Sequence, residues 1–184
     1  MAYFDRFIVS NQLGAQTVAF YTAPSEIISR LSIIPGAFAR ALFPHLSYST
    51  SAEERNKNKR KITLILFILC LPIVIAGSLL AEYIMVLWMG PSFSGSPGIV
   101  LIILLFGFLF NSLAQVPFAS IQSRGYAKFT AFVHMGELLP YLALLFYSIH
   151  HYGVIGAAIA WSIRMLVDYI VLMLIDINIT RRIH

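Results

Sequence analysis

Four apolar segments, each long enough to cross a lipid bilayer as a helix, constrain the fold of this chain more than any other feature. A bilayer core is spanned by about 20 apolar residues in helical conformation. The segments that meet this length are 62–87, 98–118, 129–149 and 153–175. Charged residues make up only 11% of the chain, against roughly 25% in a soluble domain. The sequence therefore predicts an all-α membrane protein.

A fifth segment, 15–46, is also long enough to span, but it is interrupted by prolines and charges. These residues are Pro24, Glu26, Arg30, Pro35 and Arg40. We predict a kinked helix whose polar side packs against protein, because such charges are too costly to face lipid. Residues 5–13 are predicted to form a partial helix, too short to span. The expected architecture is one transmembrane lobe over residues 1–184, with five spanning helices and the partial one.

Nine of the 13 Lys and Arg residues lie in alternate connections between these segments or in the tail, and the other four, Arg6, Arg30, Arg40 and Arg164, lie within the helical segments. Five of the 13 Lys and Arg residues lie in 47–61, two more lie in 122–128, and two lie in the tail at 181–182. The connections 90–97 and 150–152 contain no Lys or Arg. Because basic loops stay on the cytoplasmic side of a membrane, we predict a multi-pass membrane protein with a cytoplasmic C-terminus.

Several ionisable residues lie inside the predicted spans, where each costs roughly 3 kcal/mol on insertion scales. Helical spacing predicts ion pairs between Glu26 and Arg30 and between Arg164 and Asp168, each four residues apart. His134 and Glu137, three residues apart, also share a helix face.

These residues have two interpretations. In the first, they form local ion pairs that only make polar helices insertable. In the second, the arginines line a central cavity for an anionic ligand, since the guanidinium fork offers paired donors to phosphate. The cavity candidates are Arg6, Arg30, Arg40 and Arg164. The candidates for ion pairing or for coupling transport to an ion are Asp5, Glu26, Glu137 and Asp168.

Enzyme and metal signatures are not found in the sequence. It contains no Gly-rich phosphate loop, no His-Glu-x-x-His motif and no nucleophile elbow. The single cysteine, Cys70, lies in an apolar run, which excludes a disulfide framework and a Cys-based metal site. We therefore expect no enzyme activity, no cofactor, no metal and no nucleic-acid partner; the expected partner is the lipid bilayer.

A set of short motifs runs in order along the chain. The motifs are YFDRFI at 3–8, LG at 13–14, YTAP at 21–24, IP at 34–35, LFP at 42–44, QSRG at 122–125, ELLPY at 137–141 and YGVIGAAIAWSIR at 152–164. This set resembles the second half of O-antigen and capsule flippases of the bacterial inner membrane, which belong to the multidrug/oligosaccharidyl-lipid/polysaccharide exporter superfamily. Together the motifs cover nearly the whole chain.

The resemblance implies a two-lobed transporter whose lobes enclose a basic cavity and alternate its access between the two membrane faces. The implied substrate is an oligosaccharide repeat unit linked to undecaprenyl pyrophosphate, moved outward for surface polysaccharide. Asp5 and Arg6 would lie on the family's seventh helix, and Arg164 and Asp168 on its twelfth. Because this chain supplies only one lobe, the expected protein partner is an N-terminal lobe.

Two other functions remain open at this point. A drug or cation antiporter of the same superfamily would favour acidic cavity residues, whereas the balance inside these spans is at least as basic as acidic. A membrane scaffold would bind a partner through the kinked segment 15–46 and transport nothing.

Overall fold

The computed structural model describes residues 2–48 and 51–182, and this part of the chain is helical without any strand. The α-helices, in chain order, are α1 (Ala2–Leu13), α2 (Ala15–Leu31), α3 (Ile33–Ser47), α4 (Ala52–Leu79), α5 (Ala81–Met89), α6 (Ser96–Ser123), α7 (Ala127–Gly136) and α8 (Leu138–Arg182). A short 3-10 helix, η1 (Pro91–Phe93), lies between α5 and α6. The predicted all-α class is confirmed.

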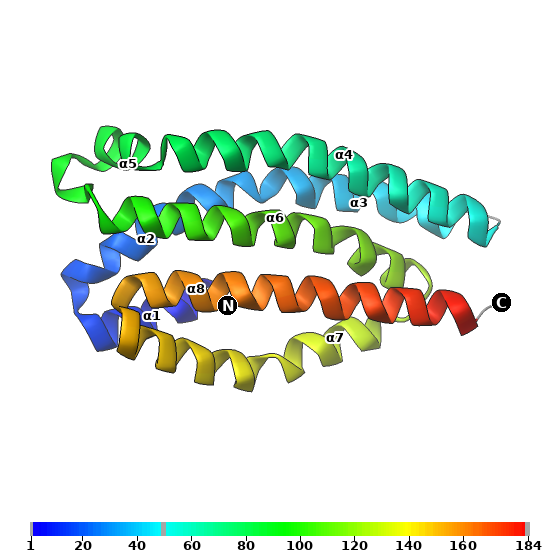
Figure 1. Ribbon diagram of the computed structural model, residues 1–184. Coiled ribbons are helices and arrows are strands. Elements are labelled where there is room, and N and C mark those ends of the chain that lie inside the picture. Colours follow the sequence, from blue (N-terminus) through cyan, green and yellow to red (C-terminus); the bar gives the residue numbers. More distant parts are fainter. Residues whose placement is uncertain (1, 49–50, 183–184) are drawn as a thin grey trace.

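The helix α8 consists of two arms that meet at a sharp bend. Gly153 has φ 59° and ψ −136°, a left-handed conformation that glycine adopts at little cost. The first arm continues from α7 and the second arm, after Gly153, runs back beside it (Figure 1). The turn is tight, because a Cβ atom at Gly156 would collide with the carbonyl of Ser148. The predicted separation of 129–149 from 153–175 corresponds to this bend.

The helix α6 forms the centre of the bundle and packs most extensively on the second arm of α8. Gly107 allows this approach, because a Cβ there would collide with the side chains of Trp161 and Ser162. The Ser162 hydroxyl also donates a hydrogen bond to the carbonyl of Ile103 at 2.8 Å. In the most apolar stretch of α6, 61% of the residues are buried inside the chain, compared with 17% in the most apolar stretch of α4. The outward face of α4 is therefore available to lipid.

Three helical stretches are long and apolar enough to cross a membrane, judged by their length and composition: Glu53–Leu79, Ser96–Ser123 and Ala127–Thr180. The last contains the bend at Gly153 and so covers two of the predicted segments. The predicted span 62–87 is divided, because α4 ends at Leu79 and α5 is a separate short helix.

The predicted segment 15–46 forms α2 and α3, which meet at Ser32. Pro35 accounts for the break, because proline cannot donate to the carbonyl four residues earlier and its ring clashes with that carbonyl. This segment is not among the stretches that meet the spanning criteria.

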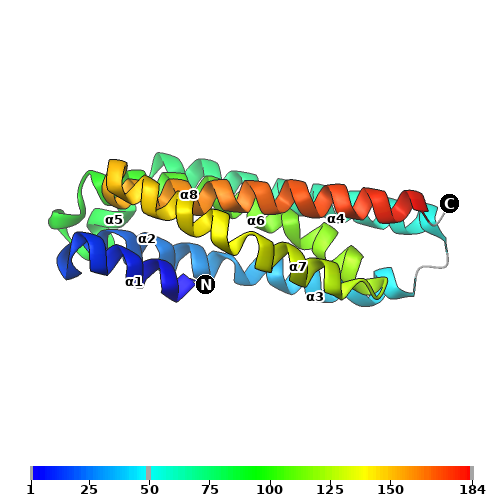
Figure 2. The same ribbon diagram turned by 90° about the horizontal axis from the view of Figure 1, so that it is seen from below.

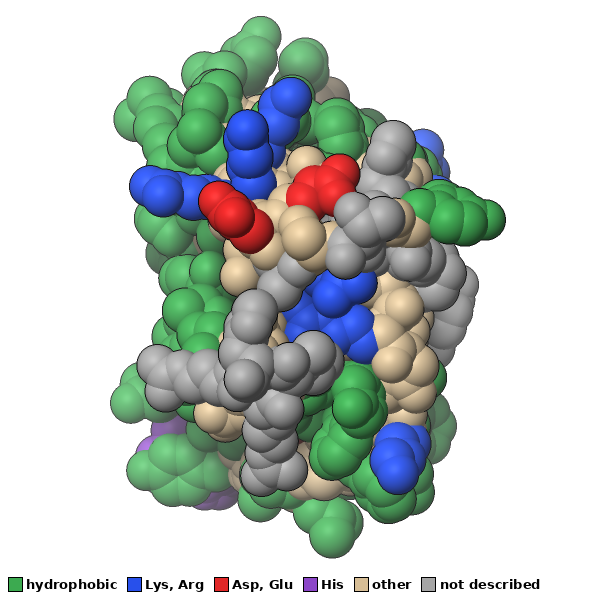
Figure 3. Space-filling model, turned by 90° about the vertical axis from the view of Figure 1, so that its right-hand side faces the viewer, with side chains coloured by type: hydrophobic (Ala, Val, Ile, Leu, Met, Phe, Trp, Pro, Cys, Tyr) green, Lys and Arg blue, Asp and Glu red, His purple; other side chains and the backbone are tan. Residues whose placement is uncertain are grey.

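The connections predicted to share a membrane side lie at the same end of the bundle. The start of α4, the turn from α6 to α7 and the end of α8 meet at one end, called here the basic end (Figures 1 and 2). Lys and Arg side chains gather on that end (Figure 3). The α5–α6 connection and the bend of α8 lie at the opposite end (Figure 1). The bundle thus separates the basic loops from those without Lys or Arg.

Candidate functional site: a buried ionisable cluster

A cluster of ionisable side chains lies where α7, the first arm and the second arm of α8 meet. We call it the Asp168 cluster, and its members are His134, Glu137, Tyr141, Arg164 and Asp168. Arg164 Nε lies 3.7 Å from Glu137 Oε2, and His134 Nδ1 lies 3.4 Å from Asp168 Oδ1. His134 Nδ1 is also 4.0 Å from Glu137 Oε2. The Arg164 guanidinium lies over the Tyr141 ring, 4.9 Å from its centroid.

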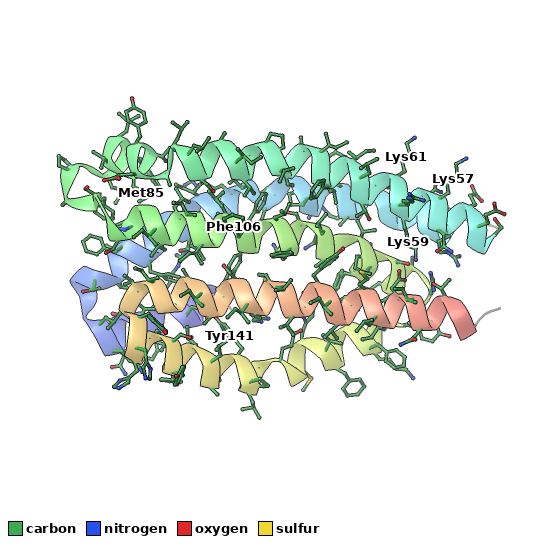
Figure 4. The ribbon with its side chains drawn as sticks, viewed as in Figure 1. Lys57, Lys59, Lys61, Met85, Phe106 and Tyr141 are labelled. Atoms are coloured by element: carbon green, nitrogen blue, oxygen red, sulfur yellow. The ribbon has the colours of Figure 1, made fainter. Side chains whose placement is uncertain are left out.

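Local helix geometry explains why these side chains converge. Glu137 sits at the junction where α7 ends and α8 begins, so its side chain turns toward the second arm. Arg164 and Asp168 are one helical turn apart and therefore share a face of that arm. Figure 4 shows Tyr141 on the first arm, between the two arms of α8.

The Asp168 cluster is mostly buried, with the His134 side chain 38% exposed, yet its polar atoms are poorly satisfied. Asp168 is 7% exposed, and the side chains of Arg164 and Glu137 are 10% and 12% exposed. Within the described residues, six of its buried atoms have no hydrogen bond of ordinary geometry: His134 Nδ1, both Glu137 carboxylate oxygens, the Tyr141 hydroxyl, Arg164 Nε and Asp168 Oδ1. Their nearest polar neighbours are one another, together with Asp5 beside the Tyr141 hydroxyl. Since buried polar groups in native proteins are nearly always hydrogen-bonded, this cluster has spare capacity for a ligand.

A charge count indicates which kind of ligand fits. With Glu137 and Asp168 ionised, Arg164 cancels one of two negative charges, and a neutral His134 leaves the other uncancelled. An uncancelled buried charge is costly, so the cluster favours one additional positive charge. A proton on His134 supplies it, and so does a bound cation, because ligand atoms of His134, Glu137 and Asp168 all lie within 4.8 Å of one another.

A second ion pair lies beside this cluster and joins α1 to α2. Arg6 Nη2 contacts Glu26 Oε1 at 2.7 Å and donates to the Ser25 hydroxyl at 3.3 Å. The neighbouring Asp5 is 2% exposed and lines a hollow of about 260 Å³ between α1, α2, α6 and α8. Asp5 also interacts electrostatically with Arg164. The Arg6–Glu26 pair and the Asp168 cluster therefore belong to one network.

The structure corrects two of the predicted pairs. Glu26 pairs with Arg6 of α1, and no ion pair with Arg30 is found among the described residues. Arg164 and Asp168 likewise pair across helices, with Glu137 and His134, and not with each other. In both cases a residue from another helix competes with the neighbour one turn away. The shared face predicted for His134 and Glu137 is confirmed.

The four cavity arginines do not converge within the described chain. Arg6 and Arg164 belong to the network above, whereas Arg30 and Arg40 are exposed on α2 and α3. Arg40 lines a separate hollow of about 380 Å³ together with Gln115 and Gln122 of α6. His134 and Tyr141 were not among the predicted site residues. The only sequence signal for His134 was its spacing of three residues from Glu137.

Comparison with known proteins finds a protein similar to this chain. The chain is 48% identical, over 172 residues, to a Shigella flexneri protein described as a "Putative O-antigen transporter". This chain is a relative of that protein. The similarity covers 94% of the chain, which confirms the resemblance to the flippase family predicted from its motifs. The chain spans 41% of that relative's length. No family model matches the chain, and no solved structure matches it significantly.

Proposed function

We propose that this chain forms one lobe of a flippase that moves undecaprenyl-pyrophosphate-linked oligosaccharide units across the bacterial inner membrane for O-antigen synthesis. The observation that carries the proposal is the 48% identity to the Shigella protein over nearly the whole chain. The C-terminus and the basic end face the cytoplasm, in keeping with the distribution of Lys and Arg.

The exposed arginines of α2 and α3 support a lobe that has a partner. Arg30 and Arg40 lie on helices that pack on one side against the apolar span α6, yet neither side chain is covered within the described part of this chain. A charge facing lipid is costly, so this face borders a second lobe or a water-filled cavity. Guanidinium groups at such a cavity suit a pyrophosphate, to which they can donate paired hydrogen bonds.

In this proposal the Asp168 cluster couples transport to a proton or a cation. Its ligand atoms come from α7, the α7–α8 junction and the second arm. Filling or emptying the site changes how strongly these elements attract one another. A ligand that binds one arrangement better shifts the population toward it, which connects ion occupancy to the access state of the cavity.

A hybrid transporter tests the proposal. The matching stretch of the Shigella relative is replaced by this chain, and the hybrid is expressed in a strain that lacks its own O-antigen flippase. We expect the hybrid to restore surface polysaccharide. The same hybrid with Arg164→Lys should restore less surface polysaccharide, because the lysine ammonium offers a point charge in place of the planar fork of donors on the arginine guanidinium.

Two outcomes contradict the proposal. A hybrid present in the membrane at normal level without surface polysaccharide excludes the flippase function. If such a hybrid instead alters the sensitivity of the cells to cationic drugs, the antiporter function is favoured over the flippase function. If the hybrid changes neither surface polysaccharide nor drug sensitivity, the scaffold function is favoured.

A further inference from the structure

A hollow of about 590 Å³ on the outer wall of the bundle has no role in the proposed transport cavity. It lies between α4, α6 and the second arm of α8, near the basic end. None of the residues that line it belongs to the Asp168 cluster or to the Arg6–Glu26 pair. Its chemistry must therefore be considered separately.

The hollow is charged at one end and apolar at the other. Lys59, Arg60 and Thr63 line its charged end on α4, and Phe67 lines it two turns further along the same helix. At 1.5 Å per residue, Lys59 and Phe67 are separated by about 12 Å along the helix axis. Leu113 from α6 extends the apolar part. This gradient runs from the basic end toward the middle of the bundle.

The charged end has an excess of positive charge. Lys59 and Arg60 line it together with Asp176, which is paired with Lys59 at 2.6 Å. Two cations therefore stand against one carboxylate among the lining residues, which leaves one positive charge, and the buried Arg124 lies behind Asp176 at 3.5 Å. Figure 4 shows Lys59 pointing from α4 toward α8, whereas Lys57 and Lys61 point away from the bundle. An anionic group at the mouth would therefore be attracted.

The apolar end opens toward the lipid. Leu64 and Phe67 on α4 are 57% and 39% exposed, and Met173 on α8 is 43% exposed. These side chains belong to spanning stretches, so their exposed faces contact acyl chains. A ligand of this hollow must have a hydrocarbon part that enters from the bilayer.

We propose that this hollow binds an anionic phospholipid of the surrounding bilayer, with the headgroup phosphate at Arg60 and Lys59 and an acyl chain along Phe67 and Met173. Basic pockets between membrane helices on the cytoplasmic side are suited to anionic headgroups. The position on the outer wall favours a bilayer lipid over the polyprenyl lipid that carries the transported oligosaccharide. The proposal does not depend on flippase activity.

Native mass spectrometry of the purified full chain in mild detergent tests this site. The chain is mixed in turn with phosphatidylglycerol, phosphatidylcholine and a polyprenyl phosphate, and bound lipid is counted. We expect phosphatidylglycerol to bind best. Arg60→Gln should weaken that binding about fivefold, since one basic residue contributes roughly 1 kcal/mol. The matched control is Lys61→Gln, which removes the same charge outside the hollow and should leave binding unchanged.

The apolar end is tested with a second pair of neighbours. Met173→Trp fills the hollow and should reduce phosphatidylglycerol binding, whereas Leu174→Trp, whose site is exposed but outside the hollow, should not. All four positions are exposed, and unchanged helical content verifies that each variant folds. Equal binding of phosphatidylglycerol and phosphatidylcholine, or equal loss in Arg60→Gln and Lys61→Gln, overturns the proposal. Preference for the polyprenyl phosphate assigns the hollow to the carrier lipid and also overturns it.

Discussion

Asp168 and Asp176 lie about two turns apart on the second arm of α8, and both are buried, with 7% and 6% of their surface exposed. Their surroundings differ. Asp176 accepts hydrogen bonds from Lys59 at 2.6 Å and from the Ser120 hydroxyl at 2.7 Å. Asp168 Oδ1 lies 3.4 Å from His134 Nδ1 and has no hydrogen bond of ordinary geometry within the described residues, and the side chains of Glu137 and Arg164 interact electrostatically with its carboxylate.

The contrast extends to the neighbours of each aspartate. Around Asp176, Arg124 donates to Thr180 at 2.9 Å, and Thr180 donates to the carbonyl of Asp176 at 2.7 Å. We call Lys59, Ser120, Arg124, Asp176 and Thr180 the Asp176 cluster. The Asp176 cluster is the better satisfied of the two, although the buried Arg124 Nε has no hydrogen-bond partner within the described residues. A largely satisfied buried network fixes the helices that it joins, here α4, α6 and α8, whereas a poorly satisfied one is a site at which something can bind. The Asp176 cluster is thus structural, and the Asp168 cluster is the candidate for function.

The largest expected effect is that of Asp176→Ala. It leaves the mostly buried charges of Lys59 and Arg124 without their carboxylate, which costs about 3–5 kcal/mol. We expect a much lower melting temperature in detergent, measured by the fluorescence of a buried-thiol dye or by circular dichroism. Asp176→Asn, which keeps an acceptor for Ser120, should lose less. A melting temperature within error of the unaltered chain would show that the Asp176 cluster does not fix these helices.

A smaller effect is expected from reversing the Arg6–Glu26 pair, which belongs to the network of the Asp168 cluster. Each single change, Arg6→Glu or Glu26→Arg, places like charges together and should lower stability by roughly 1–2 kcal/mol, because Glu26 is 39% exposed and solvent weakens the interaction. The double exchange should recover most of that loss. Glu26→Arg with Arg30→Glu is the control, and it should recover nothing. Recovery by the control alone would favour the pairing predicted from helical spacing.

That pair shows what sequence reasoning could and could not predict. The helical class, the separation of segment 129–149 from segment 153–175 and the polar residues in the spans follow from composition, apolar length and charge, which are local properties of the sequence. The partner of Glu26 does not, because Arg30 at one helical turn and Arg6 from another helix are equally suitable by charge. Only the packing of α1 on α2 places Arg6 at 2.7 Å.

The hydrogen-bond partners of the two aspartates likewise could not be predicted from their sequence context. Asp168 was predicted as a site candidate because Arg164 precedes it by one turn, and Asp176 was not included. Yet Asp176 has close partners, Lys59 and Ser120, that are 117 and 56 residues away. Such long-range contacts decide which carboxylate is satisfied, and periodicity carries no information about them.

Asp168→Asn should change stability by less than about 1 kcal/mol, because it removes the uncancelled negative charge along with any attraction to His134. In the hybrid transporter we nevertheless expect surface polysaccharide to fall at least severalfold. Comparison with Asp176→Asn, measured at equal membrane level, separates the two roles. If Asp168→Asn melts as low as Asp176→Ala and transports normally, the assignment of structural and functional clusters is reversed.

The smallest effect on the molecule is expected from cysteines that report orientation. Ser94 lies between η1 and α6 and donates one exposed hydrogen bond to Glu82 at 2.8 Å. Its replacement by cysteine should therefore cost only about 0.5 kcal/mol.

The orientation assay compares Ser94→Cys with Lys57→Cys, which lies at the basic end near the Asp176 cluster (Figure 4). The background carries Cys70→Ala, although Cys70 is only 1% exposed and should react little. An impermeant thiol reagent should label Ser94→Cys in intact cells and Lys57→Cys only after lysis, because basic loops remain in the cytoplasm. The opposite pattern would place the Asp176 cluster and the proposed lipid site on the outer side of the membrane. That result would weaken the lipid proposal, because the negative surface potential that attracts basic pockets belongs to the cytoplasmic leaflet.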